Sequence, residues 1–225
     1  MKKMMMIAAM MVAAVSANAQ FEPGTFSLQP RLGVGVSWLS NMPDLPLDEA
    51  GLSGNTLDKS PIAAASVGVE AEYQLASQFS LAAGVNYSLQ GSGWKDTDVA
   101  YEGQVVKIKD AKVELGYVNI PVTANYYLFK NFAVKAGVQF GFLTNASAKS
   151  TAEHKNNKVD TDMDMKDECE KVNISIPMGV SYQFKVPIVL DLRYNLGLTK
   201  VNKETEPKDF KNNMVELTVG YKFAL

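Results

Sequence analysis

The chain of 225 residues has a single cysteine, Cys169, and a single histidine, His154. One cysteine excludes an intramolecular disulfide framework, whatever the redox compartment. Positive charge is also scarce, since the formal net charge is -2. Nucleic acid is therefore a poor candidate partner, because its affinity for proteins rests on neutralising phosphates with Lys and Arg.

Long apolar runs are missing as well. The most apolar stretch, 4–15, follows two lysines and precedes Ala-Asn-Ala at 17–19, which is the small-x-small pattern of a signal-peptidase site. It is shorter than the ~20 residues that a membrane-spanning helix needs. We therefore expect a signal peptide at 1–19 and the mature domain at 20–225. Cleavage removes two lysines and no acid, so the formal charge goes from -2 to -4.

An exported chain without a spanning helix is periplasmic, secreted or an outer-membrane barrel. The sequence alternates with a period of two: at 188–199, IVLDLRYNLGLT, every even position is apolar. This period is typical of a β-strand. Six more segments and the C-terminus alternate likewise: 25–39, 61–75, 79–91, 112–128, 132–146, 171–184 and 215–225. Most reach the ~9–11 residues of a tilted transmembrane strand.

The connections between these segments are unequal. Three are tight turns, at 76–78, 130–131 and 185–187. Four are long, and we expect them to be external loops: 40–60, 92–111, 147–170 and 200–211. Outer-membrane barrels have this asymmetry, with short periplasmic turns and long external loops. The sequence therefore predicts an all-β fold, an eight-stranded antiparallel up-and-down transmembrane β-barrel in the outer membrane, with both termini on the periplasmic side.

The composition of the two strand faces separates this barrel from a soluble, lipocalin-like one. The less apolar face is rich in Gly, Ser, Ala and Asn, whereas a solvated surface carries more Lys and Glu. Small residues suit the crowded interior of an eight-stranded barrel. We therefore expect the apolar face to meet lipid, between two aromatic girdles. The girdle at the long-loop end comprises Trp38, Tyr87, Trp94, Tyr117, Phe140 and Phe142.

Charged residues on the inward face are balanced. Four are basic and four acidic: Arg31, Lys135, Arg193 and Lys222, with Glu70, Glu72, Asp191 and Glu216. Lone buried charges are costly, so a zero sum favours a paired internal network. We expect a structural network that plugs the barrel and leaves no ion-conducting lumen. The alternative is a narrow porin-like channel for small solutes.

Two irregularities interrupt the strand pattern. The alternation slips between Leu115 and Val118, which predicts a β-bulge near Gly116. Three prolines cannot donate a ladder hydrogen bond, and we expect them at bulges or near a rim. They are Pro30, Pro121 and Pro177.

Acidic residues crowd one predicted loop: Asp160, Asp162, Asp164, Asp167, Glu168 and Glu170. Asp-x-Asp-x-Asp begins a calcium-loop pattern. Met165, however, stands where the tight turn needs Gly, and Lys171 where a bidentate Glu belongs. A solvated acidic loop is the favoured interpretation, with loose divalent-cation binding as the alternative. No resident metal or cofactor is predicted.

An outer-membrane lipid-modifying enzyme would need a nucleophile and a base held together near the outer rim. His154 lies in a predicted loop, and Ser147 and Ser150 are its nearest candidate partners in sequence. Nothing in the sequence fixes their geometry, so no catalytic residues are assigned and we expect a protein that is not an enzyme.

Three stretches resemble known patterns, two of them from one family. Residues 115–128, LGYVNIPVTANYYL, are similar to the Tyr-x-x-Ile-Pro signature of the Bacteroidetes outer-membrane β-barrel domain, the PorT-like family. Residues 190–199, LDLRYNLGLT, resemble the Arg-Tyr-x-x-Gly-Leu strand of that family. The last eight residues, TVGYKFAL, resemble the barrel-assembly signal through Thr218, Gly220, Phe223 and Leu225, with Leu in place of the usual terminal Phe.

The resemblance implies a small outer-membrane barrel, often called porin-like without proven transport. Its implied partners are outer-membrane lipid and the barrel-assembly machinery. One class of members takes part in secretion and gliding, but no motif here singles out that role. Together with the pattern of long loops, the sequence predicts a structural or interaction role in which the external loops are available to a protein partner.

Overall fold

The computed structural model describes residues 22–44, 53–54, 57–101, 104–154, 157–203 and 209–225. The predicted signal peptide lies outside these residues, as do parts of the predicted loops 40–60 and 200–211. Among the residues described, no helix has the length and apolarity needed to cross a bilayer.

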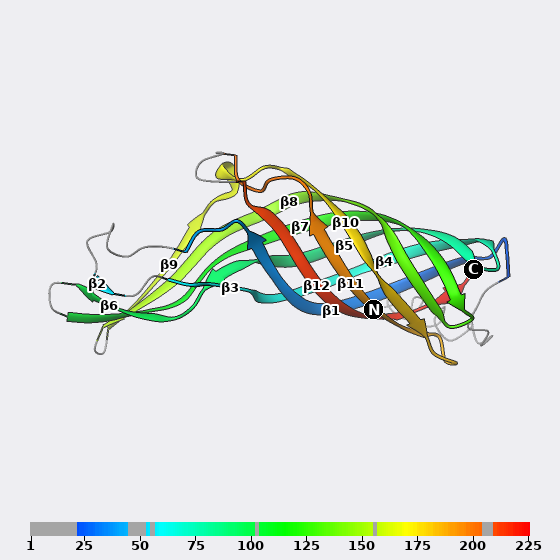
Figure 1. The fold of residues 1–225 in the computed structure, drawn as a ribbon, viewed down its shortest axis with the longest axis horizontal. Coiled ribbons are helices and arrows are strands. Elements are labelled where there is room, and N and C mark those ends of the chain that lie inside the picture. Colours follow the sequence, from blue (N-terminus) through cyan, green and yellow to red (C-terminus); the bar gives the residue numbers. More distant parts are fainter. Residues whose placement is uncertain (1–21, 45–52, 55–56, 102–103, 155–156, 204–208) are drawn as a thin grey trace, which may run out of the picture.

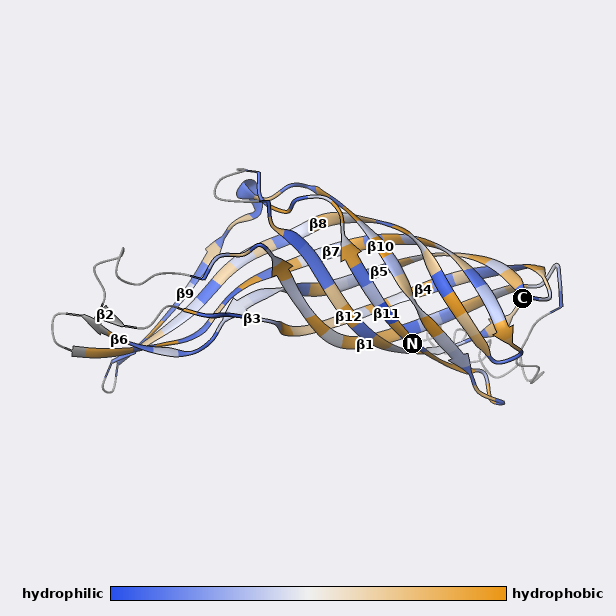
Figure 2. Ribbon diagram, viewed as in Figure 1, coloured by the Kyte–Doolittle hydropathy of each residue, from blue (hydrophilic) through white to orange (hydrophobic). Residues whose placement is uncertain are grey.

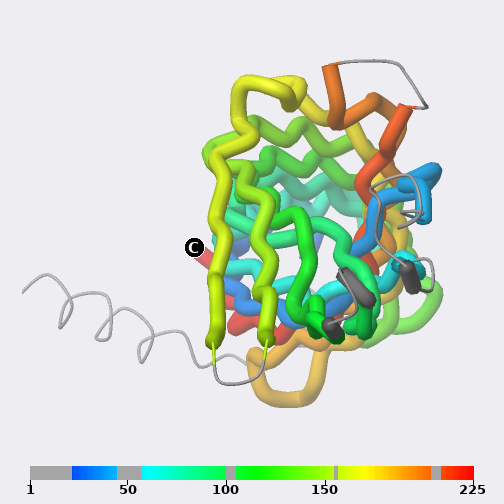
Figure 3. The backbone as a smooth tube through the Cα atoms, turned by 90° about the vertical axis from the view of Figure 1, so that its left-hand side faces the viewer, coloured from blue at the N-terminus to red at the C-terminus, as the bar shows by residue number. Residues whose placement is uncertain are grey.

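Eight strands form a closed antiparallel ring (Figures 1 and 3). They are β1 (Phe26–Ser40), β4 (Ile62–Ala76), β5 (Phe79–Trp94), β7 (Gln104–Phe129), β8 (Phe132–His154), β10 (Val172–Gln183), β11 (Ile188–Gly197) and β12 (Lys211–Tyr221). Each strand pairs with the next one in this order. Pairing of β12 with β1, from Arg31 opposite Gly220 to Ser40 opposite Lys211, closes the ring. The predicted eight-stranded up-and-down barrel is confirmed.

The three tight turns also lie where the sequence predicts them, after β4, β7 and β10. The first and last strands meet at this same end of the barrel. Short β13 (Phe223–Ala224) pairs with the start of β1, and the Leu225 N–H donates to the Phe26 carbonyl over 2.9 Å. We call this the short-turn end and its opposite the long-loop end.

At the long-loop end the sheet continues far beyond the ring (Figure 1). β6 (Thr97–Tyr101) pairs with the beginning of β7, and β9 (Asn157–Asp164) pairs with the last part of β8. Short β2 (Ser53–Gly54) and β3 (Lys59–Ser60) pair with β6 and β5, and a 3-10 turn, η1 (Lys166–Glu168), follows β9. We call β6, β9 and the adjoining parts of β7 and β8, residues 104–115 and 146–154, the extension.

The extension corrects two predicted loops, 92–111 and 147–170. Most of both stretches is strand, because each folds as a hairpin whose backbone groups pair with one another. Backbone pairing satisfies donors and acceptors that a loop would leave to water.

A bulge lies next to Gly116 as predicted, but on the partner strand β8 rather than on β7. The register of β7 against β8 shifts between Gly116 and Tyr117, where the extra residue is Thr144 of β8. The Thr144 hydroxyl donates to the Gly116 carbonyl over 2.9 Å, which satisfies an acceptor that the disrupted ladder leaves free.

The three prolines do not lie at bulges, which was one of the two places predicted for them. Pro30, Pro121 and Pro177 each pair with the strand on one side, while the ladder on the other side skips two residues and resumes in the same register. A proline lacks only the N–H donor. The neighbouring pairs are enough to hold the register, so the barrel accommodates each proline by omitting bonds on one side.

The faces of the barrel wall have the predicted orientation, with alternate residues apolar and polar along each strand (Figure 2). Leu32 and Val34 on β1 are each 66% exposed, whereas Arg31 is buried. Among aromatics at the long-loop end, Tyr87, Phe140 and Phe142 are exposed as a girdle requires. Tyr117 and Trp94 are not girdle residues: they pack inward at the long-loop end, because Tyr117 lies near the point where β7 enters the apolar wall and Trp94 follows the part of β5 that leaves it.

Candidate functional site

The middle of the barrel is filled by charged side chains that reach across from β1, β4, β8 and β11. Glu70 accepts from Arg31 Nη1 at 2.7 Å, from Lys135 Nζ at 3.0 Å and from Arg193 Nη2 at 3.1 Å. Asp191 accepts from Lys135 Nζ at 2.7 Å and Arg193 Nη2 at 3.3 Å. All five side chains are at most 5% exposed. We call them the central cluster.

A second cluster lies nearer the short-turn end. Lys222 Nζ is 2.8 Å from Glu72 Oε2 and donates to the Tyr127 hydroxyl over 3.2 Å. The other carboxylate oxygen of Glu72 accepts from Ser80 Oγ at 2.7 Å and from the Tyr127 hydroxyl. Tyr127 and Ser80 are therefore members of the network that charge counting did not identify. Both residues occupy inward positions of the alternating pattern, and this position in the sequence could have identified them.

The eighth predicted charge, Glu216, accepts from Ser66 Oγ at 2.8 Å and Asn195 Nδ2 at 3.3 Å. The structure thus brings all eight predicted residues inside the barrel, in three groups. The central cluster has three cations and two acids, the second cluster one of each, and Glu216 is one acid, so the groups carry +1, 0 and -1. Neutrality is reached only across the whole interior.

Little space remains among these side chains. A cavity of about 10 Å³ lies at the short-turn end, bordered by Glu72, Lys135 and Lys222 among others. That volume is close to the ~10–15 Å³ minimum for one water. The interior is therefore packed with side chains here, as expected of a barrel of eight strands.

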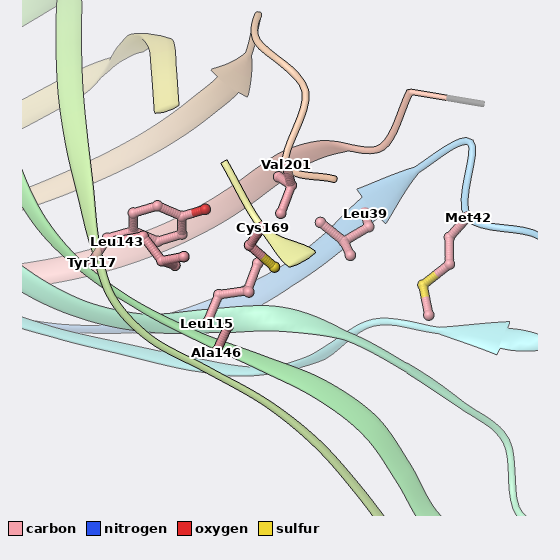
Figure 4. Packing of buried hydrophobic residues seen from close by; sticks show 8 residues of the cluster. All are labelled: Leu39, Met42, Leu115, Tyr117, Leu143, Ala146, Cys169 and Val201. Carbon is pink, nitrogen blue, oxygen red and sulfur yellow. The ribbon is translucent and has the colours of Figure 1, made fainter. Parts of the chain in front are cut away.

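An apolar layer covers the polar interior at the long-loop end (Figure 4). It consists of Leu39, Met42, Leu115, Tyr117, Leu143, Ala146, Cys169 and Val201, all buried. Leu115 and Ala146 have no exposed surface, and they are paired with each other across the β7–β8 ladder, on the extension side of the bulge. Burial raises the pKa of the Cys169 thiol, so the cysteine is held in its neutral form. We call this set the apolar cap.

A pocket of about 550 Å³ lies beyond the apolar cap, between it and the extension. Its lining is largely apolar: Leu39, Met42, Pro43, Leu57, Trp94, Ile108, Ala111, Val113, Ala148, Met163, Met165, Cys169, Val201 and Phe210. Sequence reasoning missed it. The signal was the alternation of Asp160, Asp162 and Asp164 with Thr161, Met163 and Met165, which predicts a two-faced strand rather than an acidic loop.

The acidic residues of β9 lie on the face opposite the pocket lining. Asp160 accepts from Thr151 Oγ1 at 2.8 Å, a bond that lowers the pKa of its carboxyl. Asp162 faces Lys149 at 3.9 Å, and Asp164 accepts from the Lys166 N–H at 2.9 Å. Across the part of the chain that the structure describes, His, Cys, Asp and Glu side chains form no group of three that could hold a metal ion.

The candidate catalytic residues do not come together. His154 Nδ1 lies 3.0 Å from the Val105 carbonyl, at the far end of β8. Ser147 is on the same strand seven residues earlier, about 23 Å away at ~3.3 Å per residue. Ser150, four residues away, is also beyond hydrogen-bonding reach of the imidazole.

The four residues of the suggested assembly signal lie at the β12–β1 seam. Thr218 is fully buried and accepts from Arg31 Nη2 at 3.0 Å. Gly220 faces Gln29, whose side chain fills the space of its missing Cβ. Phe223 pairs with Leu28, and Leu225 is 74% exposed.

A closed ring with a charged core and an apolar outer wall is the architecture of an outer-membrane barrel, in which lipid replaces water around the strands. The chain belongs to the outer membrane protein beta-barrel domain family, which matches residues 18–203. It is therefore an outer-membrane protein. No curated protein matches the sequence.

Solved structures with similar folds come from several bacteria. Ail, the attachment invasion locus protein of Yersinia pestis, is 13% identical with a TM-score of 0.41, over 89% of this chain and 99% of that one. Neisserial surface protein A is 12% identical with a TM-score of 0.43, over 88% and 97%. The outer membrane protein OprG of Pseudomonas aeruginosa is 10% identical with a TM-score of 0.38, over 92% and 98%.

Proposed function

We propose that this protein is a non-conducting outer-membrane barrel that serves as a rigid scaffold for an interaction surface outside the membrane. The observation that supports a closed barrel is the central cluster, in which Glu70 alone contacts three cations from three other strands. Its side chains span the lumen from wall to wall.

The energetics of the central cluster favour a permanent plug. An ion path would require these groups to separate inside a poorly hydrated lumen. Removing one partner from a buried ion pair costs about 3–5 kcal/mol. Spontaneous opening of a network with five such contacts at 3.3 Å or less is therefore rare.

The extension is the part of the molecule suited to contact a partner. It is ordered by strand pairing, stands clear of the ring (Figure 1), and exposes Val105, Val159 and Met163 by 57–61%. Apolar side chains that remain exposed on an ordered surface often mark interaction sites. The predicted loops contribute here as strands rather than as flexible segments.

The same proposal includes how the protein is exported, how it is assembled and which barrels it is related to. Residues 1–19 act as a signal peptide, and Thr218, Gly220, Phe223 and Leu225 act as the signal read by the barrel-assembly machinery. The Tyr-x-x-Ile-Pro and Arg-Tyr-x-x-Gly-Leu stretches support a place in the PorT-like, porin-family barrels of Bacteroidetes.

Conductance decides between the plugged barrel and the narrow channel. The mature chain, reconstituted in planar lipid bilayers beside a known porin as positive control, is expected to give no stable single-channel current. Reproducible unitary currents would contradict the plug and favour the porin-like alternative. Heat-modifiable migration on gels shows that the tested sample is folded.

A further inference from the structure

The pocket between the apolar cap and the extension has no role in a plugged scaffold. Its volume of about 550 Å³ lies within the ~300–1,000 Å³ typical of small-molecule sites. A folded protein partner would need a broader and flatter surface than this concavity. The shape of the pocket therefore suits a small molecule better than a folded partner.

The chemistry of the lining restricts the class of ligand. The pocket is walled by aliphatic, Met and aromatic side chains from β1, β5, β7, β8 and β9. Its one indole donor is already used, since Trp94 Nε1 donates to the Pro43 carbonyl over 3.3 Å. Ser150, Thr161, Glu168 and Asn202 also line the pocket, but most of its lining is apolar. A ligand rich in polar groups would therefore lose more hydrogen bonds to water than it could replace here, whereas an alkyl chain loses none.

Charged groups of the extension pair with one another near the pocket, and Glu168 is also among the lining residues. Glu114 is 2.8 Å from Lys112 Nζ and 2.6 Å from Lys149 Nζ, so these charged groups pair with one another. Lys112 and Lys149 also border the pocket. As charged groups of the lining, they offer a place for the polar end of a chain-like molecule.

A second hollow lies beside the exposed Val36 of β1. It measures about 350 Å³ and is lined by Val36, Trp38, Leu39 and Pro61, among others. Pairing of β1 with β4 ends at Ser37 opposite Ile62, and this hollow lies just beyond that point. Leu39 borders both hollows. The two hollows therefore meet the same part of β1. Ser40, Asn41, Lys59 and Ser60 also line the second hollow.

We infer that the pocket above the apolar cap binds a molecule built on an alkyl chain. Two sources have this chemistry, a free hydrocarbon-like compound and the acyl chain of a membrane lipid. Binding here is independent of whether the barrel conducts, so the conductance experiment neither supports nor removes it.

Trp94 provides the measurement, because it is one of two tryptophans in the chain and lies in the pocket lining. The mature Trp38→Phe variant, in lipid nanodiscs, leaves Trp94 as the only indole. Bromododecane added to the nanodiscs is expected to quench it saturably. Nanodiscs made with bromine on the lipid acyl chains test the second source. Quenching by either one supports the site and identifies its source; quenching by neither overturns the inference.

A matched pair of variants separates pocket binding from general partitioning. Met163 lines the pocket and Val159, on the same face of β9, does not, yet the two are 60% and 61% exposed. Met163→Asp is expected to weaken quenching about tenfold or more, because it sets a carboxylate in the apolar wall. Val159→Asp should leave it unchanged. Equal effects of both variants would overturn the inference.

Cys169 gives a second readout without substitution. It is the only cysteine and also lines the pocket. Saturating bromododecane is expected to slow its alkylation by N-ethylmaleimide, followed by mass spectrometry, in wild type and not in Met163→Asp. An unchanged rate in wild type would contradict occupancy of the pocket.

Discussion

The barrel wall and the extension share β7 and β8 but are amphipathic in opposite senses. In the ring, β7 and β8 turn Ile120 and Phe140 outward and Asn119 inward. Beyond the bulge, the same two strands turn Leu115 and Ala146 inward and place Glu114 on the outer face. The solvent around each part explains the inversion. Lipid requires an apolar exterior, and water requires an apolar interior.

The bulge beside Gly116 makes this inversion possible, because it changes which residues of β8 point inward. In β8 the extra residue, Thr144, moves the inward positions from odd to even numbers, so that Leu143 and Ala146 both point in. In β7 the orientation does not change, and the sequence itself changes from polar to apolar on the inward face. One insertion on one strand therefore lets an ordinary strand alternation serve two environments.

The largest expected effect comes from removing a buried acid of the wall. Glu70→Gln keeps the shape but leaves Arg31, Lys135 and Arg193 one carboxylate short. Destabilisation of about 3–5 kcal/mol is expected, measured by urea unfolding in lipid vesicles. Glu114→Gln removes a carboxylate that also pairs with two lysines, but in the extension. Exposed pairs contribute about 0–1 kcal/mol. Similar losses in the two variants would contradict the contrast between wall and extension.

Two valines of similar exposure, one on the wall and one on the extension, test which surface meets lipid. Val34 of β1 and Val159 of β9 are 66% and 61% exposed. Val34→Lys is expected to destabilise folding into vesicles by about 2–4 kcal/mol, because it sets a charge against hydrocarbon. Val159→Lys should change stability by about 0.5 kcal/mol or less, as surface substitutions in water do. A Val34→Lys variant as stable as wild type would mean that this face of β1 is not in the bilayer.

Sequence alternation was enough to predict the wall, because the pattern in each strand reports directly on its two environments. Arg31, Glu70 and Asp191 could be placed inside from parity alone. The ion pairs among them could not be predicted, because these depend on the register between strands that are far apart in the sequence. Glu70 meets Arg193 across 123 positions of sequence.

The extension was predicted poorly for a related reason. A strand with Asp on one face and Met or Thr on the other has the alternation of a soluble strand, opposite in sense to the wall. With lipid-facing strands as the template, residues 160–165 look like an acidic loop. The pocket could not be predicted from the sequence, because Met163, Trp94 and Cys169 line it together only in the folded structure.

The pH dependence of the extension gives a smaller effect. Hydrogen bonds from Lys112 and Lys149 hold the pKa of the Glu114 carboxyl below its usual value. Because the folded pKa is the lower one, this stabilisation is complete above the unfolded pKa of ~4.3 and is lost as the pH falls through the folded value. A loss of about 0.2–1 kcal/mol is expected, followed by thermal melting of Trp94 fluorescence in the Trp38→Phe variant. Glu114→Gln should flatten this part of the profile, and an unchanged profile would show that the pairs do not stabilise the extension.

The smallest expected effect is that of one hydroxyl in the apolar cap. Tyr117 Oη is buried without a hydrogen-bond partner in the described structure, whereas the Tyr127 hydroxyl in the barrel interior bonds both Glu72 and Lys222. Tyr117→Phe should therefore change stability by about 0.5 kcal/mol or less, or stabilise slightly, because no bond is lost. Tyr127→Phe leaves charged groups short of a partner and should cost about 1–3 kcal/mol. Urea unfolding of both variants in vesicles measures the difference. A larger loss for Tyr117→Phe than for Tyr127→Phe would mean that the cap is polar and hydrated, which would also remove the physical basis for an alkyl-chain site above it.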